Sequence, residues 1–210
     1  MKKDFSFFPK FKEIKFSSHP ESKIDISSYD EARNHISSHF SKSSDVLSLY
    51  EFGTVRAPSI SDIDLMLVLK DSPSNDIHNF IKRDSINSLA RYLMMGSTLM
   101  IMNEEGFRKI SLWDDMNLSN LFGKKIENIK ISDSDFKFIE IARVMDWLPE
   151  RTLRMLELVT RKEVPTRATL CLINSFIYVL ERLKLLHKPI VLELGVNRGG
   201  STLVFLKNIN

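Results

Sequence analysis

The sequence has a single cysteine, Cys171, so no disulfide can form within the chain. A reducing compartment suits such a chain, because structural disulfides are typical of oxidising ones. The sequence also lacks any run of roughly 18 apolar residues, the length that a membrane span needs. The residues after Met1 contain no continuous apolar segment of the kind that forms a signal peptide. We therefore expect a cytoplasmic protein with no membrane partner, in which Cys171 is a small buried hydrophobe.

A large excess of charge of either sign is also missing. The 210 residues include 30 Lys and Arg against 27 Asp and Glu, which gives a formal net charge of +3. This balance does not by itself indicate nucleic acid or a membrane surface as a partner, although it tolerates an anionic ligand. Hydrophobic residues make up 43% of the chain and charged residues 27%, so the chain can bury a sizeable core. Its length fits one functional unit.

Hydrophobic periodicity divides the chain into four parts. They are an N-terminal arm (1–26), an α/β domain (27–131), a helical domain (132–188) and a strand with a glycine-rich turn (189–210) that either closes the helical domain or opens a truncated second one. In the α/β domain the pattern predicts a helix from near Tyr29 to Phe40 with a Ser28–Glu31 capping box, and a second helix at 75–92. It also predicts strands at 46–52, 62–69 and 98–102, followed by short helical and loop pieces over 104–132. In the helical domain it predicts helical segments on both sides of Pro149 and a helix after Pro165. The predicted fold class is therefore α/β, a mixed sheet covered by helices and followed by a helical bundle.

Two aspartates lie two residues apart in the second predicted strand. Successive side chains of a strand point to opposite faces, so Asp62 and Asp64 share one side while Ile63 and Leu65 face the core. Mg²⁺ prefers oxygen ligands and is usually held by one or two carboxylates together with substrate phosphates. In a two-metal site, the ions stabilise the attacking and the leaving oxygen of an in-line displacement. The two aspartates therefore predict a metal site for phosphoryl or nucleotidyl transfer.

A short loop joins the first two predicted strands and begins with Gly53 and Thr54. Glycine lets the backbone approach a phosphate closely, and the threonine hydroxyl and neighbouring amides can donate hydrogen bonds to it. The guanidinium group of Arg56 can add a charge-assisted contact. Together with Ser61, which directly precedes Asp62, these residues are the candidates for nucleotide binding.

The stretch Phe52-Gly-Thr-Val-Arg, followed by Ser59-Ile-Ser-Asp-Ile-Asp-Leu-Met-Leu-Val, resembles the signature of the polymerase-beta-like nucleotidyltransferase superfamily. In that superfamily a hydrophobic residue, a glycine and a Gly or Ser precede an Asp-hydrophobic-Asp strand whose aspartates bind the metals. The resemblance is strongest over residues 49–70 and extends over 45–131. It implies a mixed-sheet α/β core, two Mg²⁺ ions and a nucleoside triphosphate donor. The matching positions are Gly53, Thr54, Asp62 and Asp64.

The sequence departs from this pattern in three places. Thr54 stands where Ser is usual, and the loop between Thr54 and Asp62 is shorter than in most members. Such enzymes also usually carry a third carboxylate on a later strand, as a base and metal ligand. The candidate strand at 98–102 contains no acid, so Glu104, just past its end, is our candidate third acid. Other acids that follow are Glu105, Asp114 and Asp115.

The expected function is Mg²⁺-dependent transfer of a nucleoside monophosphate from a nucleoside triphosphate to an unknown acceptor, which is a small molecule, a protein or a nucleic acid. Two alternatives remain open. Without a third acid, the protein would be a catalytically inactive binding or regulatory module of the same fold. Residues 189–202 resemble the first motif of class I S-adenosylmethionine-dependent methyltransferases, with Glu193, Gly195 and Gly199 in matching positions. In that case the chain is the front part of a longer protein.

Overall fold

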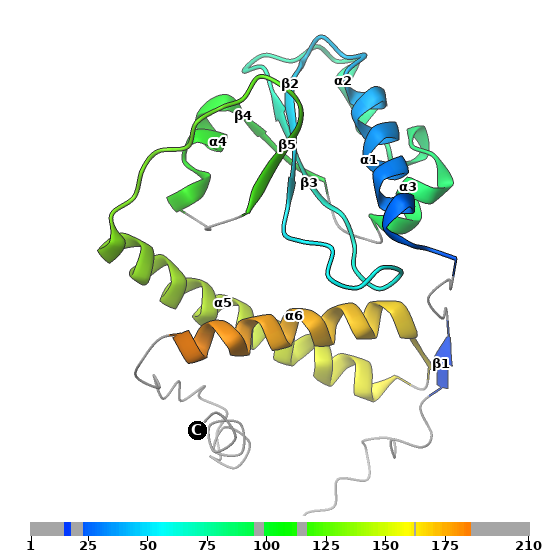
Figure 1. Cartoon of the computed structure of the whole chain (residues 1–210), viewed down its shortest axis with the longest axis vertical. Helices are drawn as coiled ribbons and strands as arrows, with labels where there is room; N and C mark the ends of the chain where they lie inside the picture. The colour runs from blue at the N-terminus through cyan, green and yellow to red at the C-terminus, as the bar shows by residue number, and fades with distance from the viewer. Residues whose placement is uncertain (1–14, 18–22, 95–98, 113–116, 162, 186–210) are drawn as a thin grey trace, which may run out of the picture. The chain divides into compact units, whose positions relative to one another are not determined.

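A computed structural model of the chain contains two compact units (Figure 1). The first spans Pro20–Asp133, and the second combines Met1–His19 with Ser134–Asn210. The first unit holds a sheet with its helices, and the second holds two long helices. The structure describes residues 15–17, 23–94, 99–112, 117–161 and 163–185.

The first unit is built on a four-stranded sheet with the strand order β4-β3-β2-β5. β2 runs antiparallel to both β3 and β5, whereas β4 runs parallel to β3, so the sheet is mixed. A parallel neighbour requires a crossover connection, and the chain between β3 and β4 supplies it with helices α2 and α3. The strands are β2 (Val46–Phe52), β3 (Asp64–Leu69), β4 (Met100–Asn103) and β5 (Leu118–Gly123). The predicted mixed α/β class is confirmed.

Helix α1 (Ile26–Phe40) begins earlier than predicted. Its N-cap is Asp25, whose carboxylate accepts hydrogen bonds from the backbone N–H of Ser28 at 3.0 Å and from its hydroxyl at 3.1 Å. The predicted Ser28–Glu31 capping box is therefore wrong, because Asp25 is an equally favourable cap and stands where the extended backbone ends. The other helices of this unit are α2 (Ile77–Ile81), α3 (Ser88–Leu93) and α4 (Glu104–Arg108), with 3-10 turns at Arg83–Ser85 and Ile110–Leu112.

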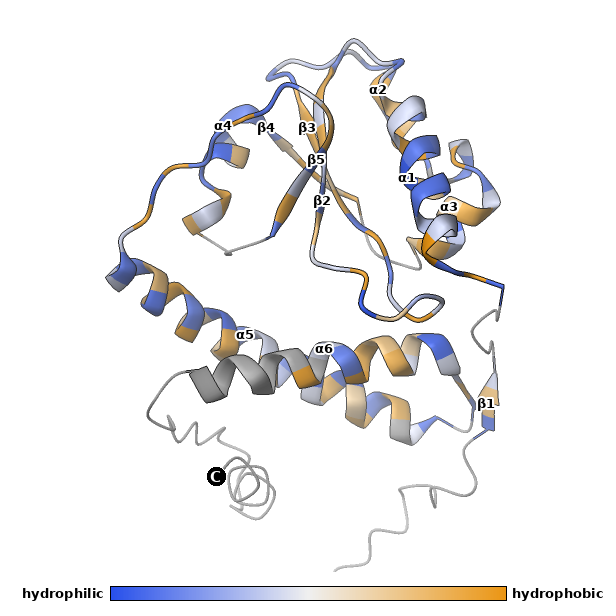
Figure 2. Ribbon diagram, viewed as in Figure 1, coloured by the Kyte–Doolittle hydropathy of each residue, from blue (hydrophilic) through white to orange (hydrophobic). Residues whose placement is uncertain are grey.

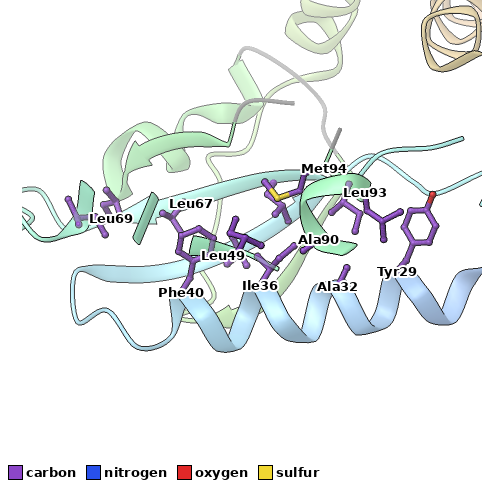
Figure 3. Close-up of a cluster of buried hydrophobic side chains, with 14 residues drawn as sticks. Tyr29, Ala32, Ile36, Phe40, Leu49, Leu67, Leu69, Ala90, Leu93 and Met94 are labelled. Atoms are coloured by element: carbon purple, nitrogen blue, oxygen red, sulfur yellow. The ribbon is translucent and has the colours of Figure 1, made fainter. Parts of the chain in front are cut away.

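Strand β3 is apolar along nearly its whole length (Figure 2), and it contributes side chains to a buried cluster on each face of the sheet. Its odd-numbered residues join one buried cluster together with α1 and α3 (Figure 3). Met66 and Val68 join a second cluster on the opposite face, where the rings of Tyr50 and Phe107 stack with centroids 4.2 Å apart. The first cluster includes Ile36, Phe40, Leu49, Leu65, Leu67 and Leu93, and the second includes Tyr50, Met66, Val68 and Phe107.

Two further element predictions in this unit are wrong. The helix expected over 75–92 is divided, because the Asn87 side chain caps a new helix by accepting from the N–H of Ala90 at 2.8 Å. The segment 118–123 forms strand β5, whereas the sequence predicts short helical and loop pieces there. Its sequence is short and partly polar, so its extended conformation depends on hydrogen bonding to β2 rather than on local preference.

The second unit contains α5 (Asp133–Thr160), α6 (Thr166–Leu185) and a small parallel sheet of β1 (Lys15–Ser17) and β6 (Glu163–Pro165). Helix α5 continues through Pro149, where the sequence predicts an interruption. Over the described parts of both units, no helix has the length and apolar character needed to cross a membrane. The glycine-rich motif at 189–202 lies outside the described residues.

Candidate functional site

The candidate residues meet where β2 ends and β3 begins. In the antiparallel register of these strands, Phe52 at the end of β2 is the partner of Asp64 at the start of β3. The Cα atoms of such partners are about 4.5–5.5 Å apart. Gly53 directly follows Phe52, so the start of the candidate phosphate loop and the second aspartate lie at the same end of the sheet. The structure therefore brings together the two halves of the sequence motif.

The two aspartates flank a fixed residue. Ile63 is fully buried in the cluster beneath α1 and α3, and its N–H donates to the carbonyl of Leu93 at 3.1 Å. Asp62 precedes β3 and Asp64 is its first residue, and both are half-buried. β3 begins at Asp64, two residues later than the predicted strand 62–69, so Asp62 and Asp64 are the chain neighbours of the anchored Ile63 on either side. Two carboxylates this close in the chain fit a hard divalent cation, which takes oxygen ligands.

The loop between the strands has a defined backbone. Gly53 adopts a φ of +82°, and a Cβ added there would meet no atom within 4 Å. Its backbone conformation, and not a lack of room for a side chain, therefore favours glycine at this position. Ser59 also has a positive φ, +68°, which costs a non-glycine residue of order 1–3 kcal/mol. Such conformations persist only where the surrounding structure holds them in place, and they are concentrated at active sites and ligand-binding sites.

Ser61 organises this loop from within. Its hydroxyl oxygen accepts hydrogen bonds from the backbone N–H of Arg56 at 3.2 Å and of Ala57 at 3.1 Å. Its own N–H donates to the carbonyl of Ala57 at 2.8 Å. Ser61 thus closes the loop into a turn just before Asp62. Thr54 and Arg56 are exposed in the same loop, where their side chains are accessible to a ligand.

Glu104 lies at the opposite end of the sheet. β4 runs parallel to β3, with Met100 beside Met66 and Asn103 beside Leu69. Glu104 follows Asn103, so the length of β3, roughly 17 Å, separates its position along the strands from that of Asp64. The structure does not bring Glu104 to the aspartates, and its assignment as the third acid is therefore withdrawn.

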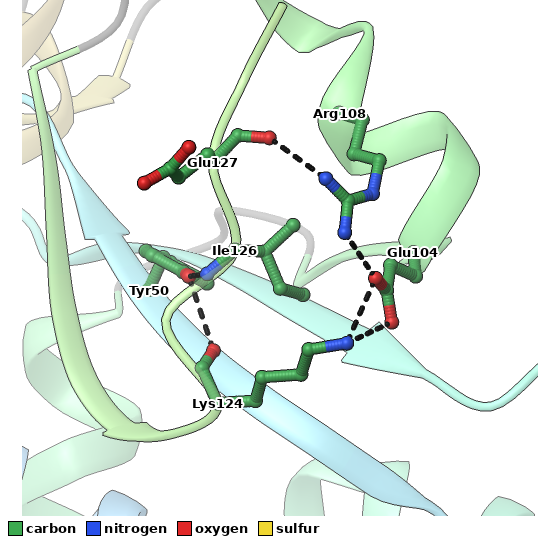
Figure 4. A network of polar contacts seen from close by, with 6 residues as sticks. All are labelled: Tyr50, Glu104, Arg108, Lys124, Ile126 and Glu127. Carbon is green, nitrogen blue, oxygen red and sulfur yellow. Dashed lines mark hydrogen bonds and ion pairs between the residues drawn. The ribbon is translucent and has the colours of Figure 1, made fainter.

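Two cations hold the Glu104 carboxylate instead (Figure 4). Lys124 Nζ donates to both of its oxygens at 2.9 Å, and Arg108 Nη2 donates at 2.6 Å. These hydrogen bonds, that of Lys124 foremost, hold the pKa of Glu104 below its usual range. A carboxylate kept ionised in this way is a poor proton acceptor, so the network is structural: it ties α4 to the segment that follows β5.

No other described side chain completes a metal set. Within the described ranges there is no group of three or more His, Cys, Asp or Glu residues that could hold a metal ion. Asp114 and Asp115 lie outside those ranges. The two aspartates still fit Mg²⁺, because this ion takes many of its oxygen ligands from substrate phosphates and water.

Comparison with known proteins adds no assignment. No protein-family model, no curated protein and no solved structure matches the chain. The function is therefore inferred from the sequence and the structure of the chain itself.

Proposed function

We propose that the protein is a Mg²⁺-dependent nucleotidyltransferase that moves a nucleoside monophosphate from a nucleoside triphosphate to an acceptor. One observation carries this proposal: the β2–β3 register sets Phe52, and with it the Gly53–Thr54 turn, beside Asp64. A glycine-containing turn suited to phosphate next to two carboxylates suited to Mg²⁺ is a combination that can bind a Mg²⁺–triphosphate complex. The mixed sheet and the similarity to the polymerase-beta-like nucleotidyltransferase superfamily support the same function.

Each residue of the site has a role in this reaction. Asp62 and Asp64 would hold Mg²⁺, which when bound lowers the charge on the phosphates and stabilises the leaving oxygen. The backbone at Gly53 and the hydroxyl of Thr54 would receive the triphosphate, and Arg56 would add a charge-assisted hydrogen bond. The acceptor oxygen attacks the α-phosphorus, the bond to the bridging oxygen of the β-phosphate breaks, and pyrophosphate leaves. The acceptor proton passes to solvent.

A second candidate is a module of the same fold that binds a nucleotide without turnover. The observation behind it is the position of Glu104, which Lys124 and Arg108 hold at the far end of the sheet. Such a module would retain the loop and the two aspartates as a Mg²⁺–nucleotide site. It differs from the enzyme in a single measurable property, the release of pyrophosphate.

The test is incubation with each of the four labelled nucleoside triphosphates and Mg²⁺, followed by measurement of nucleotide binding and pyrophosphate release. The variants are Asp62→Asn and Asp64→Asn, with Glu104→Gln as a matched carboxylate-to-amide control. We expect both aspartate variants to lose Mg²⁺-dependent binding and release, and the control to retain them. Binding without release by the wild type would select the second candidate. Binding that is indifferent to both aspartate substitutions would exclude this site.

A further inference from the structure

Helix α1 contacts the end of the loop that joins β2 to β3 and the strand that leads into this loop. At the end of the loop, the Tyr29 hydroxyl donates to the carbonyl of Ser61 at 2.7 Å, directly before Asp62. In β2, Arg33 donates to Glu51, two residues before Gly53, through Nε at 2.6 Å and Nη2 at 2.8 Å. Tyr29 and Arg33 are one helical turn apart, so they lie on the same side of α1.

Both contacts are anchored on the helix. Tyr29 is fully buried at one end of the row of apolar side chains that α1 presents to the sheet (Figure 3). Its hydroxyl is thus fixed in position by the packing of its ring. Because a buried hydroxyl without a partner is costly, the hydrogen bond to Ser61 also fixes the backbone of the loop.

The contact between Arg33 and Glu51 is equally constrained. The Glu51 side chain is 10% exposed and that of Arg33 20%, and the two groups form a bidentate ion pair. Asp30 also accepts from Arg33, at 2.9 Å. An ion pair in this environment is retained only with good geometry, since removal of one partner leaves a charge that is largely withdrawn from water. It therefore fixes the direction in which β2 enters the loop.

We infer that α1 positions the nucleotide loop: Tyr29 holds the end that carries Asp62, and Arg33 with Glu51 holds the end that carries Gly53. The inference rests on the proposed function in assigning this loop to the nucleotide. Tyr29, Arg33 and Glu51 are positioning residues: Tyr29 holds the backbone of the loop, and Arg33 with Glu51 holds the strand that enters it, so all three act through the loop and not on the substrate. Because Tyr29 and Arg33 are one helical turn apart on α1, the helix then fixes the distance between the proposed phosphate-binding turn and the proposed metal-binding aspartates.

The first test measures the loop without any ligand. Tyr29→Phe removes the hydroxyl and keeps the buried ring. A matched control is Tyr50→Phe, because the Tyr50 hydroxyl holds a different segment by accepting from the N–H of Ile126 at 2.7 Å. We expect amide hydrogen exchange in residues 54–62 to accelerate about five- to tenfold in Tyr29→Phe, as the loss of one hydrogen bond implies. In the control we expect the acceleration in residues 124–129 only.

The second test measures transfer. We expect kcat to fall about three- to tenfold in Tyr29→Phe with the KM for the nucleotide within twofold, because the loop still forms but holds Asp62 less well. Tyr50→Phe should leave kcat within twofold of the wild type. The same split is expected for Glu51→Gln, which removes the charge from the other end of the loop.

The outcomes separate the inference from the proposed function. Unchanged exchange in residues 54–62 of Tyr29→Phe would overturn the positioning role, whether or not the wild type is an enzyme. Equal acceleration of both segments in either variant would also overturn it, since the effect would then be global. If exchange accelerates locally in Tyr29→Phe while the wild type neither binds nor transfers nucleotide, the positioning role of α1 is supported and the nucleotidyltransferase function is excluded.

Discussion

Phe52 at the end of β2 is the direct antiparallel partner of Asp64 at the start of β3. Because the loop leaves β2 and enters β3 at the same end of the sheet, the start of the loop and the Asp64 carboxylate lie close together. In the proposed function, the backbone at Gly53 would accommodate a phosphate and Asp64 would be a metal ligand. Each of these features alone is common in proteins. Their proximity in this structure leads to predictions that separate the conformation of the loop from its chemistry.

Gly53 and Gly123 both have a positive φ, and they should respond differently to alanine. In Gly53→Ala the new Cβ meets no atom within 4 Å, so the cost is that of the left-handed backbone, about 1–2 kcal/mol. In Gly123→Ala the Cβ would collide with the carbonyl oxygen of Leu47 in addition, so the loss of stability should be larger. Urea denaturation measures both. Nucleotide affinity should fall only in Gly53→Ala among variants that remain folded, and equal stabilities would contradict the assigned backbone.

Thr54 should act through its hydroxyl. Thr54→Ser keeps the hydroxyl and restores the residue usual in the superfamily that the loop resembles, so its affinity for a Mg²⁺–nucleotide complex should stay within about twofold of the wild type. Thr54→Ala removes the donor to a charged phosphate and should weaken binding by about tenfold or more. Titration with a fluorescent triphosphate measures both. If Ser and Ala weaken binding equally, the hydroxyl does not contact the phosphates.

Ile63 should couple the core to the site. It is fully buried between the two aspartates, so Ile63→Ala should cost about 2–5 kcal/mol through the lost contacts and the cavity. Ile63→Val removes one methylene group and should cost about 0.5–1.5 kcal/mol. At temperatures where both variants are folded, the affinity for Mn²⁺, a spectroscopic substitute for Mg²⁺, should decrease in the order of these costs. Unchanged affinity in the folded Ala variant would show that the aspartates do not depend on this anchor.

Strands β2 and β5 differ in how well the sequence predicts them. The alternation of 46–52 predicts β2 with its observed bounds, because the period of a strand's side chains is itself a local signal. β5 carries no such signal. Its polar residues Ser119 and Asn120 are extended because β2 offers hydrogen bonds, and a partner distant in sequence is invisible to a local pattern.

The same distinction applies to the site. Gly53, Asp62 and Asp64 are close enough in the sequence for their spacing to suggest a site, and the β2–β3 pairing places Phe52, the residue before Gly53, beside Asp64. The positions of Tyr29 and Glu104 depend on tertiary packing, so spacing could not find the first or exclude the second. A signal for the α1 contact was nevertheless present, since Glu51 is a charged residue in an otherwise largely apolar strand, and such a residue requires a partner.

Asp45 should make stability depend on pH in the acid range. Its carboxylate accepts from the hydroxyl of Ser74 at 2.5 Å and from its N–H at 3.0 Å, and these hydrogen bonds, with a smaller contribution from Lys70, hold the pKa of Asp45 below its usual value. The folded-state pKa is therefore lower than the unfolded value of about 3.9. The stabilisation is complete above that value and is lost as the pH falls through the folded-state pKa.

Urea denaturation of the wild type, Asp45→Asn and Ser74→Ala between about pH 6 and pH 2 tests this assignment, because the linkage acts around and below the ordinary carboxyl pKa. Asp45→Asn keeps an oxygen that can accept from Ser74 but removes the charge, so its deficit relative to the wild type should be greatest at the upper end of this range and should shrink on acidification. Ser74→Ala removes the donor that contributes most to the lowered pKa and should show the same trend. A deficit independent of pH in both variants would mean that the hydrogen bonds do not favour the ionised form of Asp45.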